Sequence, residues 1–205
     1  MIYKTCGKRL LDLILASIGL IILSPIFAIT ALAVRFKLGS PIIYSQRRPG
    51  HNAVPFTLYK FRTMTNAKDN DGNLLPDFER ITPLGKFLRS TSLDELPELW
   101  NVIKGDMSLV GPRPLLMEYL DKYTPQQARR HEAKPGITGW AQINGRNTLS
   151  WEERFKMDVW YIENQSFWLD LKILFLTLWK VLNREGIHEP GHVTMTKFSG
   201  SEADE

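Results

Sequence analysis

Residues 92–114, SLDELPELWNVIKGDMSLVGPRP, carry the side chains best suited to phosphate chemistry. Two adjacent acids, Asp94 and Glu95, fall in the first turn of a helix expected over residues 92–104, and Arg113 follows between two prolines. The field at a helix N-terminus keeps a carboxylate ionised and attracts phosphate to the same place. An ionised aspartate can attack phosphorus and form an acyl phosphate. We therefore take Asp94 as the candidate nucleophile, and we expect Glu95, which faces another way, to have a different role.

A structural role would explain the same two acids. Ser92 followed three residues later by Glu95 fits a capping box, in which each side chain accepts a hydrogen bond from a backbone N–H of the first turn. In that case the acids stabilise the helix and take no part in chemistry. Spacing alone leaves both interpretations open.

Several basic residues are candidates for binding a diphosphate. Lys60 and Arg62 flank Phe61, and alternation along a strand would place both on one face. The prolines on either side of Arg113 restrict its backbone, which suits bidentate phosphate recognition. The candidates are Lys60, Arg62, Arg89, Arg113 and Arg146. For any one of them, a surface charge or a salt bridge is the structural alternative.

Composition limits the partners and the chemistry. The 205 residues suffice for one domain with a core, and the net charge of +4 favours anionic lipid headgroups or phosphorylated ligands. There is no basic stripe with interleaved aromatics, so nucleic acid is not expected as a partner. The single cysteine, Cys6, excludes an internal disulfide. The histidines lack metal-ligand spacing and are expected on the surface or in loops; they are His51, His131, His188 and His192.

Residues 10–34, LLDLILASIGLIILSPIFAITALAV, form a strongly apolar segment with one charge, Asp12. A straight helix of this length would measure roughly 37 Å, enough to cross a bilayer core of ~30 Å. No small-residue cleavage site follows it, which argues against a secretory signal peptide. Ser24-Pro25 lies near the middle, and proline removes a backbone hydrogen bond, so a break or kink is expected there.

Basic residues flank this segment on both sides, with Lys8 and Arg9 just before it. A spanning helix would gain no clear orientation from such a pattern, whereas a hairpin that returns to the cytoplasm suits both flanks. We therefore predict a re-entrant helix broken at Ser24-Pro25. A kinked helix that spans the bilayer is the alternative. The predicted organisation is a membrane helix over residues 1–40, a cytoplasmic catalytic domain over 41–200 and a disordered tail over 201–205.

The rest of the chain predicts an α+β fold that is mostly helical. Residues 42–46 and 54–62 alternate as short strands around the turn RRPGHN, which indicates a β-hairpin. The polar stretch 65–80 predicts a loop with a short helix. The apolar stretch 167–182 is either a buried core helix or an interfacial helix. Further helices are expected at residues 84–88, 92–104, 117–132 and 151–163.

Three motifs together resemble a known family. They are LYKFRTM, the run SLDELPELWNVIKGDMSLVGPRP and KPGITGWAQINGRN. In this order they resemble the bacterial sugar transferases, and more narrowly the small monotopic phosphoglycosyl transferases, over nearly the whole chain. The closing stretch GHVTMTKFSG is most similar to members that transfer phospho-N,N′-diacetylbacillosamine to undecaprenyl phosphate in protein glycosylation. One departure is Glu98, where these proteins often have glutamine; we expect it to face solvent.

The resemblance implies a reaction and a location. A UDP-sugar binds with Mg²⁺ held by Asp94 and Glu95, and Asp94 attacks the β-phosphorus. Undecaprenyl phosphate then takes the phosphosugar from the aspartate. Asp158, in the segment MDVWY, is a further candidate for contact with the substrate. The family resemblance also implies a monotopic protein on the cytoplasmic face of the bacterial inner membrane, in contact with phospholipids and working with downstream glycosyltransferases.

Two other functions are compatible with these residues. A non-catalytic membrane-docking module that binds nucleotide-sugars would use Asp94 and Glu95 only for helix capping. A single-step transferase would use Asp94 as a metal ligand or base, form a ternary complex and leave no phosphosugar on the protein.

Overall fold

The computed structural model describes residues 3–145, 149–183 and 197–200. Arg146, His188, His192 and the tail 201–205, for which the sequence made predictions, lie outside these residues.

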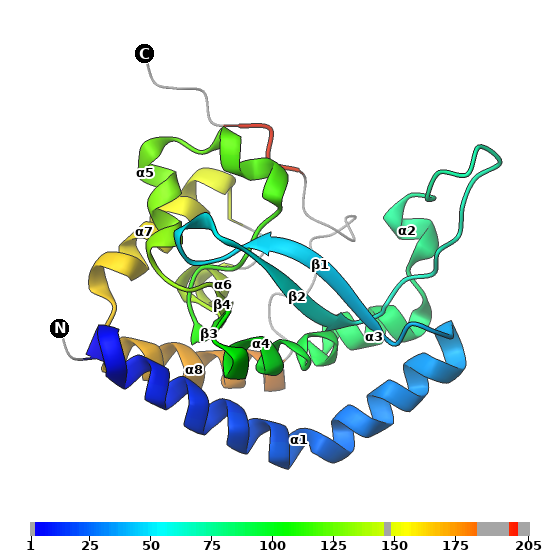
Figure 1. Ribbon diagram of the computed structural model, residues 1–205, viewed down its shortest axis with the longest axis horizontal. Coiled ribbons are helices and arrows are strands. Elements are labelled where there is room, and N and C mark those ends of the chain that lie inside the picture. Colours follow the sequence, from blue (N-terminus) through cyan, green and yellow to red (C-terminus); the bar gives the residue numbers. More distant parts are fainter. Residues whose placement is uncertain (1–2, 146–148, 184–196, 201–205) are drawn as a thin grey trace.

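The described chain is mostly helical with two small two-stranded sheets, which confirms the α+β class (Figure 1). The longer helices are α1 Lys8–Leu38, α3 Pro83–Ser90, α4 Glu98–Lys104, α7 Trp151–Asn164 and α8 Phe167–Asn183. The shorter ones are α2 Asp77–Arg80, α5 Pro125–Ala128 and α6 Trp140–Asn144, with a π-helical turn η1 at Tyr3–Gly7. The 3₁₀ segments are η2 His51–Ala53, η3 Leu93–Glu95, η4 Met117–Lys122 and η5 Arg129–Glu132. The strands are β1 Ile43–Pro49, β2 Pro55–Phe61, β3 Ser108–Val110 and β4 Gly136–Thr138.

The apolar segment forms one continuous helix, α1, of 31 residues. It is long and apolar enough to cross a membrane by length and composition. Figure 1 shows it bent near its middle, with its two halves rising toward the rest of the molecule. The predicted break is therefore a bend within a helix rather than two helices joined by a loop.

Ser24 and Pro25 explain how the bend is tolerated. Proline has no N–H, so Pro25 cannot donate the bond that the Ile21 carbonyl would otherwise accept. The Ser24 hydroxyl donates to that carbonyl instead, at 2.8 Å. In an apolar surrounding an orphaned carbonyl would be costly, so the pair both bends the helix and satisfies its backbone.

Both ends of α1 are fixed to the same domain. At the N-terminal end Lys8 forms a buried ion pair with Asp170 of α8 at 2.6 Å, and Asp12 accepts hydrogen bonds from the Ser108 hydroxyl and the Leu109 N–H. At the other end the helix packs on β2 and α3, where Phe27 lies 4.8 Å from the ring of Phe61. The middle is exposed, and its largest exposed side chains include Ile21, Ile22 and Ile29.

The predicted hairpin is confirmed as antiparallel β1–β2, with Ile43 opposite Phe61 and Pro49 opposite Pro55. Strand β1 runs three residues closer to the turn than the sequence predicted, whereas β2 begins at Pro55, one residue later than predicted. The turn includes Asn52 and Ala53, both at positive φ. The second sheet, parallel β3–β4, was not predicted because each strand is only three residues long.

Two predicted helices are broken. Residues 92–104 divide into η3 and α4 with Pro97 between them, and residues 117–132 divide into η4, α5 and η5 around Pro125. In each case proline interrupts the backbone ladder. Helices α3 and α7 and the short helix within the 65–80 loop are confirmed.

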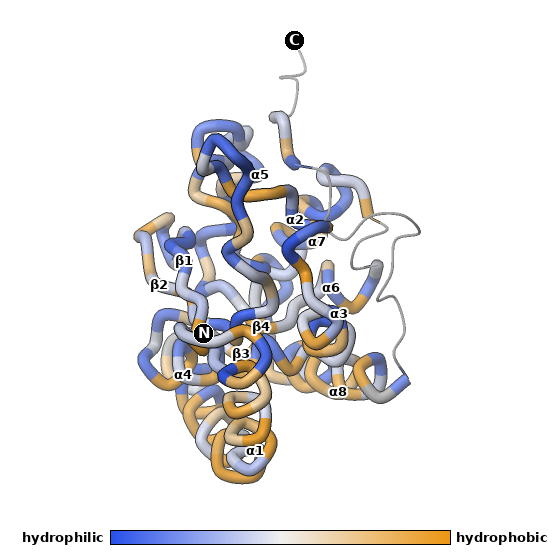
Figure 2. The backbone as a smooth tube through the Cα atoms, turned by 90° about the vertical axis from the view of Figure 1, so that its right-hand side faces the viewer, coloured by the Kyte–Doolittle hydropathy of each residue, from blue (hydrophilic) through white to orange (hydrophobic). Residues whose placement is uncertain are grey.

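Apolar elements gather on one side of the molecule. Figure 2 shows α1 and α8 along the lower side, rich in apolar residues, with the more hydrophilic β1, α5 and α7 above. Helix α8 contributes to the core, where Ile173 is fully buried, while Trp168 and Phe175 are exposed. An interfacial position for its exposed face stays a prediction. The main core lies between α1, α4, the second sheet and α8; its buried members are Ala16, Leu58, Val102, Met107, Leu109, Val110, Ile143, Tyr161, Ile162 and Ile173.

Candidate active site

Glu95 is the centre of a partly buried ionic cluster. Its Oε1 accepts hydrogen bonds from Lys60 of β2 and from Arg113, each at 2.6 Å. Burial raises the pKa of the Glu95 carboxyl, but the charges and hydrogen bonds of Arg113 and Lys60 outweigh burial and hold it far below its usual range. Glu95 is therefore a fixed negative charge that brings two cations from distant parts of the chain to one point.

The capping-box interpretation of Glu95 is wrong. Ser92 adopts a left-handed conformation, with φ of 57°, and its side chain makes no capping hydrogen bond. The Glu95 side chain is directed instead to Lys60 and Arg113. Local spacing predicted a helix cap, but ion pairs across the fold determine where this acid points.

Asp94 is buried beside this cluster, only 7% exposed. Among the described residues it forms no ion pair, although Lys60, Arg89 and Arg113 are all close enough for their charges to favour its ionised form. Burial, and then the charge of Glu95, nevertheless raise its pKa above the usual value. Its carboxylate is thus surrounded by cations without being neutralised by any of them in contact.

Glu98 lies inside the cluster, and the expectation that it faces solvent is wrong. It is 2% exposed, and Lys60 Nζ lies 3.0 Å from its Oε1. Burial raises its pKa to about 7; the charge of Lys60 opposes the rise and that of Glu95 adds to it. Lys60 thus bridges the carboxylate of η3 and that of α4.

Arg89 reaches the cluster from α3. The Thr82 hydroxyl caps this helix by accepting the Gly85 N–H, and Gly85 packs so closely on Thr63 that a Cβ would lie 1.9 Å from its carbonyl oxygen. This contact holds α3 against the end of β2. Arg89 Nε then donates to the Thr63 hydroxyl at 3.1 Å, and among the described residues its other N–H groups have no hydrogen-bond acceptor.

Arg62 and Asp158 have other contacts. Arg62 follows the last residue of β2, so strand alternation no longer applies. It donates to the carbonyls of Leu38 and Ser40 at the end of α1 and to the carbonyl of Met64, two residues further along its own segment. Asp158 is 2% exposed and binds Arg130 through its Oδ2, at 2.7 and 3.0 Å. A role for either in substrate binding stays a prediction.

Arg130 is a site-supporting residue that sequence reasoning missed. It is 2% exposed, and besides binding Asp158 it donates to the Arg113 carbonyl at 2.8 Å. The loop that carries Arg113 is also held by backbone bonds, from the Gly111 N–H to Thr138 and from the Gly136 N–H to the Pro112 carbonyl. Nothing in the RRHE stretch distinguishes Arg130 from its surface neighbour Arg129.

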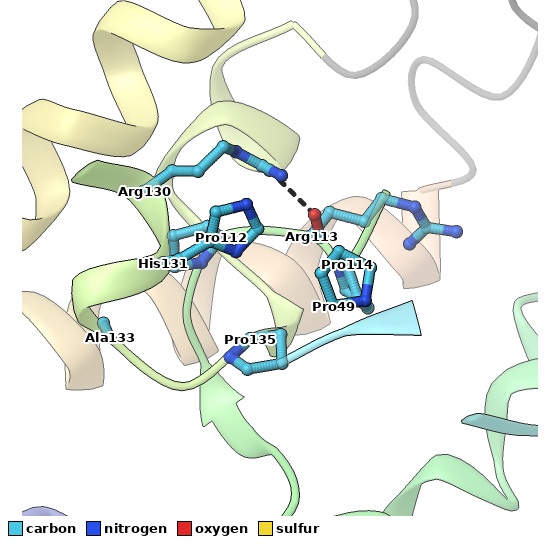
Figure 3. A pocket seen from close by; sticks show the side chains of 8 residues that line it. All are labelled: Pro49, Pro112, Arg113, Pro114, Arg130, His131, Ala133 and Pro135. Carbon is cyan, nitrogen blue, oxygen red and sulfur yellow. Dashed lines mark hydrogen bonds between the residues drawn. The ribbon is translucent and has the colours of Figure 1, made fainter. Parts of the chain in front are cut away.

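A small pocket lies behind this loop (Figure 3). Its cavity volume is about 10 Å³, room for about one water molecule and far below the roughly 300–1,000 Å³ of typical ligand sites. Figure 3 shows the Arg113 guanidinium directed away from it, so the pocket is not where Arg113 would meet a substrate. His131 lines this pocket and is 9% exposed, which corrects its expected surface position; burial, and then the Arg130 charge, lower its pKa to about 4.

Of the two acids expected to hold Mg²⁺, Asp94 fits a divalent cation better than Glu95. Mg²⁺ is usually held by one or two carboxylates together with substrate phosphates. Asp94 meets this requirement because it is a buried carboxylate without an ion-pair partner among the described residues. Burial, and then the charge of Glu95, raise its pKa, and a bound cation would favour the ionised form that burial disfavours. Glu95 fits less well because Lys60 and Arg113 both contact its Oε1. The described residues contain no cluster of three potential metal ligands.

Comparisons with known proteins identify the family. A family model described as bacterial sugar transferase matches residues 3–184. The chain is 61% identical over 194 residues to an uncharacterized sugar transferase, EpsL, of Bacillus subtilis, with 95% of this chain and 96% of that protein aligned. It is 46% identical over 184 residues to a UDP-glucose:undecaprenyl-phosphate glucose-1-phosphate transferase of Klebsiella pneumoniae, and 40% identical over 198 residues to an undecaprenyl-phosphate galactose phosphotransferase of Salmonella typhimurium.

The chain belongs to the bacterial sugar transferase family. It is an enzyme, a sugar-phosphate transferase, and the apolar helix α1 indicates that it associates with a membrane. The alignments cover 84% and 88% of this chain but 39% and 41% of the Klebsiella and Salmonella proteins, so it spans about two fifths of their length.

Proposed function

We propose that this protein transfers a sugar 1-phosphate from a UDP-sugar to undecaprenyl phosphate and releases UMP, through a phosphosugar bound covalently to Asp94. The observation that carries the proposal is the arrangement around Asp94. Its carboxylate is buried next to three cationic side chains, Lys60, Arg89 and Arg113, yet no ion pair among the described residues occupies it. The named relatives act on undecaprenyl phosphate, which supports the acceptor.

The first half-reaction uses this arrangement directly. Lys60, Arg89 and Arg113 bind the diphosphate of the UDP-sugar and spread its negative charge. An Asp94 oxygen attacks the β-phosphorus, and the bond from that phosphorus to the bridging oxygen breaks, so that UMP leaves with the electron pair. A Mg²⁺ ion held by Asp94 and the substrate phosphates would stabilise the charge that develops in this transfer.

The second half-reaction restores the enzyme. An oxygen of undecaprenyl phosphate attacks the phosphorus of the aspartyl phosphosugar, and Asp94 leaves as the carboxylate. The product is undecaprenyl-diphospho-sugar. Two successive displacements on one nucleophile predict ping-pong kinetics.

The shape of α1 supports a re-entrant rather than a spanning helix. Lys8 and Asp12 bind one edge of the catalytic domain, and Phe27 packs on the other, so both ends return to the same body. A helix that crossed the bilayer would place its ends on opposite faces. We place the domain on the cytoplasmic face, where the headgroup-level phosphate of undecaprenyl phosphate can meet Asp94 without the lipid leaving the bilayer.

The donor sugar and the fate of the glycan are finer predictions. The resemblance noted in the sequence predicts UDP-N,N′-diacetylbacillosamine and a route to protein glycosylation with downstream glycosyltransferases. The relatives' names include glucose and galactose. All three UDP-sugars therefore belong in the test.

The reaction is tested with purified protein in lipid vesicles, Mg²⁺, undecaprenyl phosphate and each UDP-sugar in turn. We expect one donor to give UMP and undecaprenyl-diphospho-sugar, and Asp94→Asn to give neither. Asp121→Asn, at an exposed aspartate, is the matched control and should behave as wild type. The single-step mechanism would be favoured if UMP is released only when both substrates are present and the kinetics are not ping-pong. No turnover with any donor would favour a binding module.

The topology is tested with the natural cysteine. Cys6 is exposed just before α1, and Ser45→Cys adds a second exposed label after it. A re-entrant helix predicts that a membrane-impermeant maleimide labels both positions from the same face of oriented vesicles. Pro25→Ala should shift the protein toward a spanning arrangement in which the two positions label from opposite faces. Opposite labelling in the unsubstituted helix would contradict the re-entrant assignment.

A further inference from the structure

Phe198, near the C-terminal end of the chain, is docked in an aromatic box. It is 3% exposed, and its ring lies 5.1 Å from Phe155, 5.5 Å from Trp151 and 5.6 Å from Tyr119. Its backbone is held as well, because its N–H donates to the Tyr119 hydroxyl and its carbonyl accepts from Lys122. Such a contact set fixes one residue far more firmly than its exposed neighbours.

The opposite wall of this box carries Arg130. The Arg130 guanidinium lies 5.6 Å from the ring of Phe155 and 5.8 Å from that of Tyr123. Phe198 contacts the same two rings, stacking on Tyr123 at 5.9 Å. Phe155 and Tyr123 therefore stand between the C-terminal segment and a buried guanidinium.

Arg130 in turn holds the loop that carries the phosphate-binding arginine. Its NH2 donates to the Arg113 carbonyl, as drawn in Figure 3, while Asp158 fixes its other face. A second connection is apolar, because Leu115 belongs to the same buried cluster as Phe198 and lies two residues after Arg113. Both connections end on the backbone from which Arg113 reaches Glu95.

We infer that Phe198 is a positioning residue for Arg113: by closing the aromatic box it holds Arg130 and Leu115, and through them the backbone of the Arg113 loop. The inference rests on the proposed function in one respect, because Arg113 is taken to bind the diphosphate. Phe198 itself touches neither substrate nor reacting atoms. Its loss leaves a cavity between Phe155 and Tyr123, and the rings that flank Arg130 are then free to move into it.

The test compares full-length Phe198→Ala with Phe198→Leu, which keeps most of the apolar volume, and with Lys197→Ala as control. Lys197 is exposed, and its Nζ comes no closer than 4.0 Å to the Glu118 carboxylate. The rate of UMP release and KM for the UDP-sugar are measured well below the melting temperature of each variant. We expect Phe198→Ala to lower kcat/KM on the order of tenfold, Phe198→Leu to recover most of it and Lys197→Ala to leave it unchanged.

A double-mutant cycle separates positioning from general loss of stability. If Phe198 acts through Arg113, Phe198→Ala lowers kcat/KM in the wild type but has no further effect in Arg113→Ala. An equal loss in both backgrounds would overturn the inference. Wild-type rates in Phe198→Ala, together with impaired rates in Arg113→Ala, would also overturn the inference. That result would leave the proposed function intact.

Backbone hydrogen exchange gives a readout that does not depend on activity. Phe198→Ala should speed exchange in residues 111–116 on the order of tenfold or more, while residues 56–61 of β2 exchange as in the wild type. Unchanged exchange in residues 111–116, or equal acceleration in both segments, would overturn the inference even if no donor sugar were turned over. Absence of UMP release with this local acceleration would refute the proposed function alone.

Discussion

Two buried clusters of charged residues in this protein differ in how completely their acids are paired. At the start of α1, Asp170 accepts from Lys8 through one carboxylate oxygen and from Tyr161 through the other. In the candidate active site, Lys60 and Arg113 both contact Glu95, and Asp94 receives no ion pair among the described residues. The first cluster is complete by itself, whereas the second leaves a carboxylate and several cationic groups available to a ligand.

The comparison distinguishes buried charges that are fully paired within the fold from buried charges that are available to a ligand. Burying an ion pair is costly unless hydrogen bonds satisfy the remaining valences, and the cluster at Asp170 meets that condition. The site does not meet it, since burial raises the pKa of both Asp94 and Glu98. We interpret this as stability given up for a pre-organised phosphate site.

The largest expected effect is on catalysis at Asp94. Asp94→Asn should lower turnover on the order of 10³-fold or more, because the amide cannot act as the nucleophile. Its melting temperature should stay the same or rise, since the substitution removes a buried carboxylate of raised pKa. UMP release measures the effect on turnover, and thermal unfolding in detergent measures the effect on the melting temperature. A variant that lost activity by unfolding would not support the assignment.

The next largest effect is on stability at the other cluster. Asp170→Ala removes the partner of Lys8, which is itself only 7% exposed, and should lower the free energy of unfolding by about 3 kcal/mol. Thermal or denaturant unfolding measures it, with the exposed Asp121→Ala as control. A loss below about 1 kcal/mol would mean that Lys8 finds water or another partner, and the contrast between the clusters would weaken.

Glu98→Gln should change how stability depends on pH. The folded-state pKa of Glu98 is raised to about 7, so between its ordinary value and pH 7 the folded protein holds a proton that the unfolded chain releases. Stability therefore falls as pH rises through that window. Glutamine does not titrate, so this fall is absent in the variant. The free energy of unfolding of the variant minus that of the wild type should therefore be larger at pH 8 than at pH 5, by on the order of 1 kcal/mol. Unfolding curves that differ equally at both pH values would contradict a raised pKa.

The smallest expected effect is at the bend of α1. Ser24→Ala removes the hydroxyl that satisfies the Ile21 carbonyl and should cost about 0.6 kcal/mol, the typical value for a side-chain hydrogen bond between helices of a membrane protein. Ser17→Ala, in the same helix and far from the proline, is the control. Equal effects at Ser17 and Ser24 would show that the bend does not depend on this bond.

Local patterns in the sequence predicted much of the fold. Alternation predicted the β1–β2 hairpin, and a continuous apolar stretch predicted α8, because each depends on neighbours in the chain. The site was predicted in its residue types but not in its geometry. A cap with Ser92 was one of the two roles that spacing allowed for Glu95, and Glu98 was expected on the surface. Lys60, a residue more than thirty positions away in sequence, positions both acids.

Arg130 shows the limit most clearly. It binds Asp158 and the Arg113 carbonyl, contacts that need the Arg113 loop, η5 and α7 to meet, and no spacing within RRHE predicts them. The bend of α1 was easier to predict, because Ser24 and Pro25 act on the backbone within one turn of helix.

The most direct test of the account is intact-protein mass spectrometry of the purified enzyme mixed with a UDP-sugar that it turns over and Mg²⁺, without undecaprenyl phosphate. We predict a mass increase equal to one phosphosugar, located on Asp94 by peptide mapping, absent in Asp94→Asn and lost when undecaprenyl phosphate is added. Release of UMP only in the presence of acceptor, with the protein mass unchanged throughout, would contradict Asp94 as a covalent nucleophile.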